Sequence, residues 1–352
     1  MAKTPLPMKP TGWFQVAWSA EIGAGEVVRM KYFGTEMIAW RSTSGQVTVM
    51  DAYCEHLGAH LGYGGTVDGE ILRCPFHGWE WNMQGRNVCI PYEKQPNKGR
   101  RIRTYPVTEH SESVFIWHDV DRRAPYFDVA DALSGFDDGH SGADYYPAYG
   151  YSTLFETGLE IHPQYVMENG VDFAHFKYVH NTPLIPEFTR HDFDQPVSYV
   201  DFTIAFDDVP ADEVNSGVQA INSGVGVAAT KSWGMIDNRT LTAVTPIDES
   251  TSDVRFTVWI GRRPGDGCAE PPPGPASTHR ESSSSFKTTS ISGNTSATPI
   301  LLPCRVRNSR ALPRFASGPT SSIPPMSNRR PPLQFGDVSH SDHVRQWHQF
   351  RS

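Results

Sequence analysis

The chain has 352 residues, and its 31 Lys and Arg against 39 Asp and Glu give a net charge of −8 at pH 7. This length predicts about two domains, and no apolar run approaches the ~18–20 residues that span a bilayer. The acidic balance without a basic stripe argues against a nucleic-acid-binding surface. Five cysteines without a secretory leader argue against a disulfide framework. Together these features predict a cytoplasmic protein with no membrane span.

Short β-strands separated by turn residues are predicted for the first third of the chain. Their ranges are 26–33, 36–41, 46–51, 71–74 and 113–119. The best helix candidate covers 163–180, and longer strands follow over 197–206, 224–235, 239–246 and 253–261. The order of these elements predicts an α+β chain, in which a small all-β domain precedes a mixed domain with a large antiparallel sheet.

Two matched cysteine–histidine pairs lie in the predicted all-β domain. Cys54 and His56 form the first pair, and Cys74 and His77 form the second after seventeen intervening residues. Two thiolates and two imidazoles can bind a tetrahedral zinc ion, or a [2Fe–2S] cluster with the cysteines on one iron and the histidines on the other. Zinc fingers usually place cysteine with cysteine and histidine with histidine, whereas here each pair is mixed. The motif therefore favours the cluster over zinc.

With Gly78 and Trp79 after the second pair, this region resembles the Rieske iron–sulfur module over residues 12–120. The resemblance implies that both pairs ligate a Rieske [2Fe–2S] cluster. Histidine ligation raises the potential of such a cluster, which therefore accepts electrons readily from a ferredoxin-type or flavin donor. Two neighbours are assigned other roles: His60 to the surface or the surroundings of the cluster, and Cys89 to a small buried apolar position.

A second candidate metal centre lies in the predicted helix. His175 and His180 are five residues apart, slightly more than one helical turn, so a modest distortion directs both at one metal. Asp172 lies one turn before His175, and Asn169 lies one turn before Asp172. Two histidines and a carboxylate on one face of an iron leave positions for O₂ and substrate. Taken alone, the same spacing is also compatible with residues of purely structural role.

The two motifs in this order resemble the large subunit of Rieske non-haem iron oxygenases over residues 1–264. The resemblance implies a helix-grip catalytic domain over 121–264, with His175 and His180 as ligands of a mononuclear Fe(II). It implies that Asp172 bridges electron transfer from a Rieske histidine of a neighbouring subunit in a homotrimer, and that Asn169 is a polar residue beside the iron. Two segments are most similar to the steroid-acting branch of 3-ketosteroid 9α-hydroxylase oxygenase components and sterol 7-desaturases, namely 10–14 and 74–81.

The activity implied by the resemblance is that of the terminal oxygenase component of a monooxygenase. Such a protein uses O₂ to hydroxylate or desaturate a large apolar ring substrate, such as a steroid. NAD(P)H would act through a separate ferredoxin or flavin/iron–sulfur reductase, because the chain has neither a dinucleotide-binding glycine-rich turn nor a plant-type ferredoxin cysteine set. The alternatives are an electron-carrying Rieske protein without oxygenase activity and an inactive product of a damaged gene.

The last part of the chain, residues 265–352, has a different composition. It holds 12 of the 28 prolines, 16 serines, five acidic and ten basic residues, a mixture typical of disorder. The family takes its third iron ligand, an aspartate, from a C-terminal segment of the form Q-D-x-x-x-I-W-E, which is absent here. Asp337 and Asp342 stand in a different context, and Cys268 and Cys304 have no ligand partners at suitable spacing.

A frameshift would explain this tail as well as disorder does. In a frame that joins the third base of each codon to the first two of the next, residues 282–300 are compatible with VFELQDDIDIWEHQRYTD. This string resembles the missing C-terminal helix of the family. The hypothesis is a base gained or lost between the codons of Gly265 and Ser277, against the alternative of a natural Pro/Ser/Arg-rich tail. Translation of the present frame would remove a helix over the iron pocket.

Overall fold

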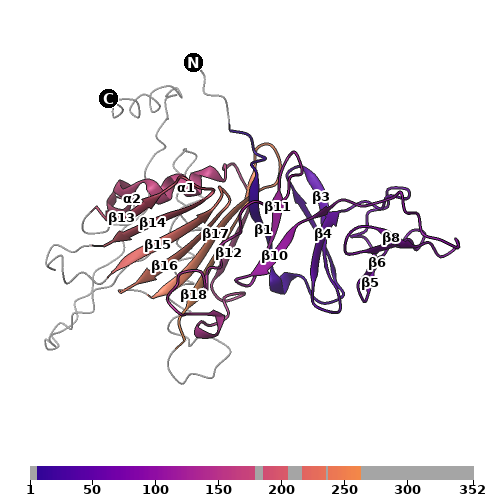
Figure 1. The fold of residues 1–352 in the computed structure, drawn as a ribbon, viewed down its shortest axis with the longest axis horizontal. Coiled ribbons are helices and arrows are strands. Elements are labelled where there is room, and N and C mark those ends of the chain that lie inside the picture. Colours follow the sequence, from indigo (N-terminus) through magenta and orange to yellow (C-terminus); the bar gives the residue numbers. More distant parts are fainter. Residues whose placement is uncertain (1–5, 179–184, 205–215, 235–236, 263–352) are drawn as a thin grey trace, which may run out of the picture. The chain divides into compact units, whose positions relative to one another are not determined.

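Antiparallel sheets dominate the part of the chain that the computed structural model describes, residues 6–178, 185–204, 216–234 and 237–262 (Figure 1). The predicted tail over 265–352 and the predicted ligand His180 lie outside these residues. In the described part, no helix has the length and apolar content of a membrane-crossing segment. The predicted α+β order is confirmed, with small sheets first and one large antiparallel sheet after them.

Three small sheets form the N-terminal part. Strand β1 (Gly12–Trp18) pairs with β11 (Ser113–His118), which also pairs with β10 (Val107–His110). The second sheet has the order β2–β3–β4–β9, with β2 Val27–Tyr32, β3 Thr35–Arg41, β4 Val47–Asp51 and β9 Thr104–Tyr105. The third has the order β5–β6–β7–β8, with β5 Thr66–Asp68, β6 Ile71–Arg73, β7 Glu80–Asn82 and β8 Asn87–Cys89. The first cysteine–histidine pair lies in the connection between β4 and β5, and the second lies between β6 and β7 of this third sheet.

A seven-stranded sheet forms the second part, and all its strand pairs are antiparallel. Its spatial order is β12 Thr153–Leu159, β18 Ser252–Ile260, β17 Asn238–Pro246, β16 Val227–Trp233, β15 Gly217–Ser223, β14 Val197–Thr203 and β13 Glu187–Asp192. Helices α1 (Gln164–Val171) and α2 (Phe173–Tyr178) lie beside β13 and β14 (Figure 1). Short 3-10 turns occur at Ser19–Glu21 and Gly142–Asp144.

All strands predicted from the sequence are present, but several others were missed. Every residue of β1 is buried, so its apolar residues show no alternation that would identify a strand. Strands β12 and β13 are the two edges of the seven-stranded sheet and are mostly exposed or half-buried. Edge strands lack the apolar face on which pattern reasoning depends, which explains why they were overlooked.

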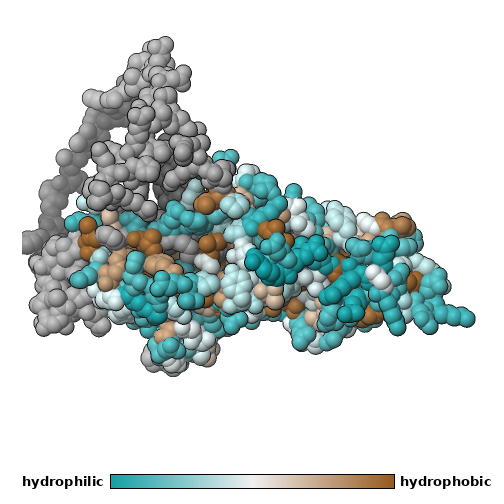
Figure 2. All heavy atoms as spheres, turned by 45° about the horizontal axis from the view of Figure 1, so that its top comes forward, coloured by the Kyte–Doolittle hydropathy of each residue, from teal (hydrophilic) through white to brown (hydrophobic). Residues whose placement is uncertain are grey.

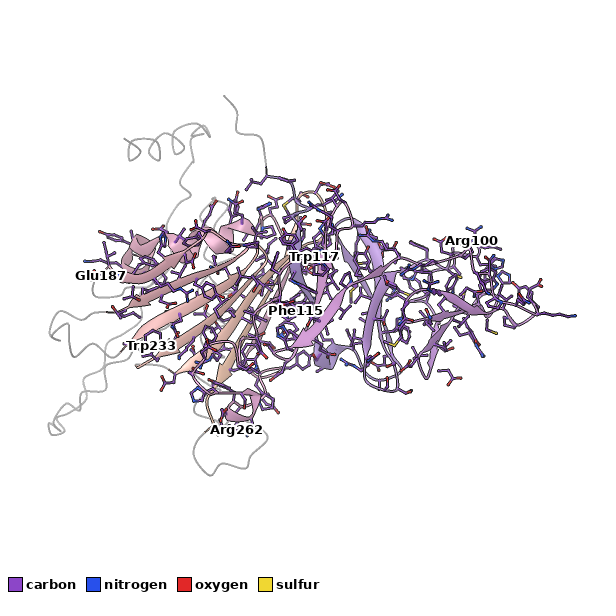
Figure 3. All side chains as sticks on the ribbon, in the orientation of Figure 1. Arg100, Phe115, Trp117, Glu187, Trp233 and Arg262 are labelled. Carbon is purple, nitrogen blue, oxygen red and sulfur yellow. The ribbon has the colours of Figure 1, made fainter. Side chains whose placement is uncertain are left out.

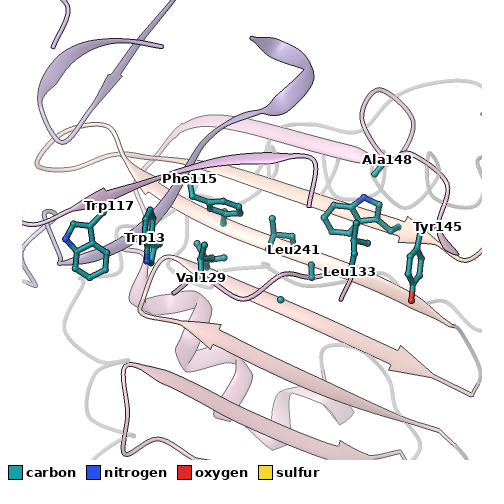
Figure 4. Packing of buried hydrophobic residues seen from close by; sticks show 13 residues of the cluster. Trp13, Phe115, Trp117, Val129, Leu133, Tyr145, Ala148 and Leu241 are labelled. Carbon is teal, nitrogen blue, oxygen red and sulfur yellow. The ribbon is translucent and has the colours of Figure 1, made fainter. Parts of the chain in front are cut away.

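An apolar cluster joins the N-terminal strands to the large sheet. Trp13 of β1 and Trp117 of β11 pack edge to face, with ring centroids 5.6 Å apart. They belong to one cluster with Leu241 of β17 and Trp259 of β18 (Figure 4). The indole N–H of Trp13 donates to the Phe127 carbonyl at 2.7 Å, so the ring is buried without losing its hydrogen bond.

A buried polar network lies across the same junction. Tyr32 of β2 donates to Asp253 Oδ2 and accepts a hydrogen bond from Arg255 Nη2, both at 2.9 Å. The Gln15 carbonyl of β1 accepts from Thr245 Oγ1 at 2.6 Å and from Arg255 Nη1 at 3.4 Å. All five residues are buried. Because a misplaced strand would leave buried charges unpaired, this network fixes the register between the two parts.

Tyr32 provides a test through pH, because burial raises its pKa to about 12. The folded state then holds the phenol proton more tightly than the unfolded state, whose tyrosine titrates near ~10. The stability from this group is complete below pH ~10 and falls by about 2–3 kcal/mol as the pH rises to ~12. We expect Tyr32→Phe to flatten this alkaline loss while lowering stability at pH 7 by about 1–3 kcal/mol, since Asp253 and Arg255 lose a partner.

Urea unfolding measured between pH 7 and pH 12 checks this expectation. The matched control is Tyr53→Phe, because Tyr53 is exposed and its loss should leave both quantities unchanged. Tyr105, whose pKa is also raised by burial, retains part of the alkaline slope in both variants. Equal slopes in the wild type and Tyr32→Phe would contradict the assignment.

Candidate metal centres

Two loops with the same backbone design carry the cysteine–histidine pairs. The N–H of Gly58 donates to the Cys54 carbonyl at 2.9 Å, and the N–H of Gly78 donates to the Cys74 carbonyl at 3.1 Å. Both glycines have a left-handed φ, +73° and +70°. The sequence folds this way because each cysteine is followed four residues later by a glycine, which adopts this conformation without strain. Each loop is thereby closed into a turn over its cysteine.

The structure brings the four predicted ligands together as two pairs, cysteine with cysteine and histidine with histidine. The thiols of Cys54 and Cys74 are buried and hydrogen-bonded to each other, while the rings of His56 and His77 lie 4.8 Å apart and are half-buried. The cysteines therefore face the apolar core, where they pack with Leu61 and Leu72, and the histidines lie nearer the surface. Among the described residues, no three His, Cys, Asp or Glu side chains surround a single metal ion.

The residues fit the two-iron group better than a single ion. Nδ1 of His77 is buried and has no hydrogen-bond partner in the described part of the chain. A buried polar atom without a partner costs free energy unless it binds something, and a metal is the natural partner of an imidazole nitrogen. The donor set, two thiols toward the core and two imidazoles toward the surface, matches cysteines on one iron and histidines on the other.

The two thiols are electrostatically unequal. The hydrogen bond with Cys74, together with burial, raises the pKa of Cys54. The same hydrogen bond, with the backbone N–H groups of Phe76 and His77, lowers the pKa of Cys74. Metals bind cysteine in its thiolate form, so each thiol that is still protonated releases a proton when a metal binds. Because the lowered pKa of Cys74 favours its thiolate beforehand, fewer protons are released.

Aromatic residues hold the two histidines. The ring of His56 stacks on Trp79 with centroids 4.4 Å apart and planes 5° apart, and Trp79 Nε1 donates to the Tyr92 hydroxyl at 2.8 Å. The ring of Phe76 lies 3.9 Å from His77. These contacts restrict the orientation of both imidazoles, which a shared metal group requires.

Two neighbouring residues were given other roles from the sequence. Nδ1 of His60 accepts from the Gly62 N–H at 3.1 Å, and the ring lies between Tyr53 and Tyr63. His60 therefore belongs to the surroundings of the first loop. Cys89 is half-buried on β8 rather than buried, and it forms no disulfide.

The second candidate centre lies on the two short helices. The single helix predicted over 163–180 is present as α1 and α2, interrupted at Asp172, where φ is −87° and ψ is 86°. Asn169 lies on α1 and His175 on α2, while His180 is outside the described residues. The ring of Phe176 lies 4.6 Å from Phe202, so α2 packs against β14. The mononuclear iron site stays a prediction, and Asp337 and Asp342, which do not match the aspartate motif of the family, lie outside the described residues.

Comparison with known families decides the relationship. Residues 12–106 match the Rieske [2Fe-2S] domain, and residues 116–288 match the 3-Ketosteroid 9alpha-hydroxylase C-terminal domain. The chain belongs to the Rieske oxygenase family. The second match extends past the boundary predicted at residue 264 and ends at residue 288. The domain boundaries at 120 and 264 stay predictions.

Curated relatives of this Rieske oxygenase fall in the steroid-acting branch. Cholesterol 7-desaturase nvd of Bombyx mori is 36% identical over 186 residues, which cover 53% of this chain and 38% of the relative. The 3-ketosteroid-9-alpha-monooxygenase oxygenase component of Rhodococcus rhodochrous is 31% identical over 184 residues, covering 52% of this chain and 46% of the relative. The chain therefore matches less than half the length of these relatives.

Solved structures agree in fold. Dicamba monooxygenase bound to dicamba superposes with a TM-score of 0.54 at 18% identity, covering 72% of this chain and 78% of that chain. The NdmA QL mutant of Pseudomonas putida CBB5 with caffeine also superposes with a TM-score of 0.54, at 15% identity, covering 83% of this chain and 84% of that one. At these identities the likeness concerns the fold alone.

A basic segment beside the cluster loops escaped the sequence analysis. Residues 91–103 contain five Lys and Arg and one Glu in a chain of net charge −8. Arg100 Nη1 lies 3.6 Å from Glu55 Oε2, which places this segment against the first ligand loop. A local charge count over a window of about a dozen residues, rather than a search for a long stripe, would have found it.

The cluster assignment predicts different results for two cysteines. We expect Cys54→Ser to abolish the visible absorbance and most of the bound iron, because a buried thiolate ligand is lost. Cys89→Ser should retain both, since Cys89 lies outside the two ligand loops. Iron analysis and ultraviolet–visible spectra of purified protein check this. Equal iron loss in both variants would contradict the ligand assignment.

The two loop glycines offer a second matched pair. A side chain at either position has to adopt a left-handed φ, at a cost of about 1–2 kcal/mol. At Gly58 a Cβ meets open space, whereas at Gly78 it lies 2.9 Å from Pro91 Cγ. We therefore expect Gly78→Ala to lower cluster occupancy and thermal stability more than Gly58→Ala. Iron content and thermal unfolding measured in parallel decide the order, and the reverse order would refute it.

Proposed function

We propose that this chain is the terminal oxygenase component of a Rieske-type monooxygenase. It would use O₂ and electrons from a separate ferredoxin or flavin/iron–sulfur reductase to hydroxylate or desaturate a large apolar ring substrate, such as a steroid. The observation that carries the proposal is the pairing of two closed cysteine–histidine loops with a helical segment that contains Asp172 and His175. The names of the relatives, a cholesterol desaturase and a ketosteroid monooxygenase, support the substrate class.

The residues divide the work between the two centres. When bound, a Rieske cluster supplies one electron at a time, and a mononuclear iron supplies the site where O₂ meets the substrate. Cys54 and Cys74 hold the cluster on the core side, His56 and His77 hold it on the surface side, and Trp79 orients His56. His175 and His180 would hold the mononuclear iron, with Asn169 beside it and Asp172 at the helix break.

A buried apolar cluster of the large sheet, which includes Ile161 shortly before the start of α1, agrees with an apolar substrate. Ile161, Ala228, Val244 and Val254 form a buried apolar cluster at this part of the large sheet, with Leu159 against it. Burial of apolar surface is the main driving force for binding a sterol-like ring system, which offers few polar groups.

A homotrimer agrees with the separation of the two centres in the fold. The second ligand loop lies between β6 and β7, whereas Asp172 lies between α1 and α2, which are drawn beside the large sheet and away from β5 to β8 (Figure 1). In this proposal, electron transfer through Asp172 uses the cluster of a neighbouring subunit.

A ferredoxin as electron donor is supported by a solved complex. An oxygenase–ferredoxin complex of carbazole 1,9a-dioxygenase superposes with a TM-score of 0.50 at 18% identity, covering 80% of this chain and 77% of that chain. Cytoplasmic localisation suits such an assembly.

The alternative is an electron carrier without oxygenase activity. It is favoured by the sequence of residues 265–352, in which the C-terminal aspartate motif of the family is absent. Re-reading the gene across the codons of Gly265 to Ile300 separates a frameshift from a natural tail. A restored aspartate motif would favour the oxygenase, and an unchanged sequence would favour the carrier.

Activity measurements distinguish the two functions directly. With reductase, NADH and a 3-ketosteroid or cholesterol, the oxygenase predicts substrate-dependent O₂ consumption and an oxidised product. We expect His175→Ala to reduce product to background while the cluster spectrum is unchanged, because His175 lies outside the cluster loops. Cluster reduction without product in the wild type, at full iron content, would overturn the oxygenase and leave the carrier.

A further inference from the structure

We propose that the basic segment 91–103 is the docking site for an acidic one-electron carrier protein of the iron–sulfur type. The inference rests on the proposed function, because it names the surface through which the cluster is reduced. In the transfer, one electron leaves the reduced carrier and enters the cluster held by the two loops, and no bond forms or breaks. The argument depends on charge, exposure and contact with the ligand loops.

The charge of this segment is opposite to that of the chain. It carries Lys94, Lys98, Arg100, Arg101 and Arg103 against one glutamate, Glu93. All but Arg103 are exposed. Figure 3 places Arg100 at the end of the molecule that holds β5 to β8, and Figure 2 shows a largely hydrophilic surface at the same end. A local positive field on an acidic protein orients an acidic partner toward one face.

The segment is a defined structure and not a loose tail. The Asn97 N–H donates to Asn87 Oδ1 at 2.7 Å, and the Ile102 N–H donates to the Gly85 carbonyl at 2.9 Å. Arg101 Nε donates to the Gln84 carbonyl at 3.2 Å. Lys94 and Lys98 make no hydrogen bond or ion pair in the part of the chain that the structure describes. Their charges are therefore available to a partner while the backbone that carries them is held in place.

A chain of contacts joins this surface to the cluster. Tyr92, at the start of the segment, is 58% exposed and accepts the hydrogen bond from Trp79, whose ring stacks on His56. Arg100 lies against Glu55, the residue between the first cysteine and histidine. A carrier seated on the segment would thus contact an aromatic path of two side chains that ends at a cluster ligand. An exposed apolar side chain beside charges is also typical of weak, transient interfaces.

The test compares two pairs of charge-removing substitutions. Lys94→Gln with Lys98→Gln removes two charges from the segment, and Lys31→Gln with Arg122→Gln removes two exposed charges from elsewhere. The probe is a plant-type [2Fe–2S] ferredoxin with an acidic surface. Its binding is measured by calorimetry, and the rate at which it reduces the cluster by stopped flow, at low and high salt. A small photoreductant serves as the reference for cluster reduction that needs no docking.

We expect the segment pair to weaken binding and slow reduction by ferredoxin about tenfold at low salt, with the difference shrinking at high salt. The control pair should remain within about twofold, and reduction by the photoreductant should be equal in all proteins. Equal effects of the two pairs, or binding of a duplex oligonucleotide without binding of ferredoxin, would overturn the docking site. Ferredoxin binding that depends on the segment, in a protein without a cluster signal in electron paramagnetic resonance, would instead refute the proposed function alone.

Discussion

Burial of metal-ligating groups is the constraint on which the N-terminal part of this protein depends. Cys54 and Cys74 belong to the same apolar cluster as Trp40, Leu61 and Leu72, and Nδ1 of His77 is buried beside them without a partner among the described residues. Polar groups in such a position destabilise a fold unless a ligand satisfies them. An iron–sulfur cluster bound by these four residues would therefore form part of the core of this domain. The free energy of binding it would also be free energy of folding.

The junction with the large sheet follows a different physical rule. There the contacts are apolar around Trp13 and Trp117 but polar around Tyr32 and Arg255. Apolar packing supplies most of the free energy, because it removes the largest area from water. The buried hydrogen bonds and charges supply geometry, since a shift of one residue in register would leave them unpaired. Together they hold β1 on the large sheet in one arrangement.

Some of this architecture could be predicted from the sequence and some could not. Mixed cysteine–histidine pairs identify the cluster loops because few groups use that donor set, and short runs of apolar, aromatic and β-branched residues bounded by turn residues identify strands such as β3 and β17. The break at Asp172 was missed, although Asn169 and Gly170 just before it form a pair that is typical of turns. The glycine turns could be suspected from Gly58 and Gly78, but their identical hydrogen bonds emerge only in three dimensions. The spacing of His175 and His180 predicts a metal site, yet only tertiary structure can assemble it.

The basic segment shows why whole-chain averages mislead about partners. A net charge of −8 predicts repulsion of an acidic carrier, and over most of the surface that repulsion is useful, because it disfavours unproductive encounters. Residues 91–103 reverse the sign locally, next to the ligand loop that contains Glu55. Attraction at this segment would direct a carrier to the approach from which Tyr92 and Trp79 lead to His56. A basic face on an acidic protein selects an orientation, which a uniformly basic protein would not do.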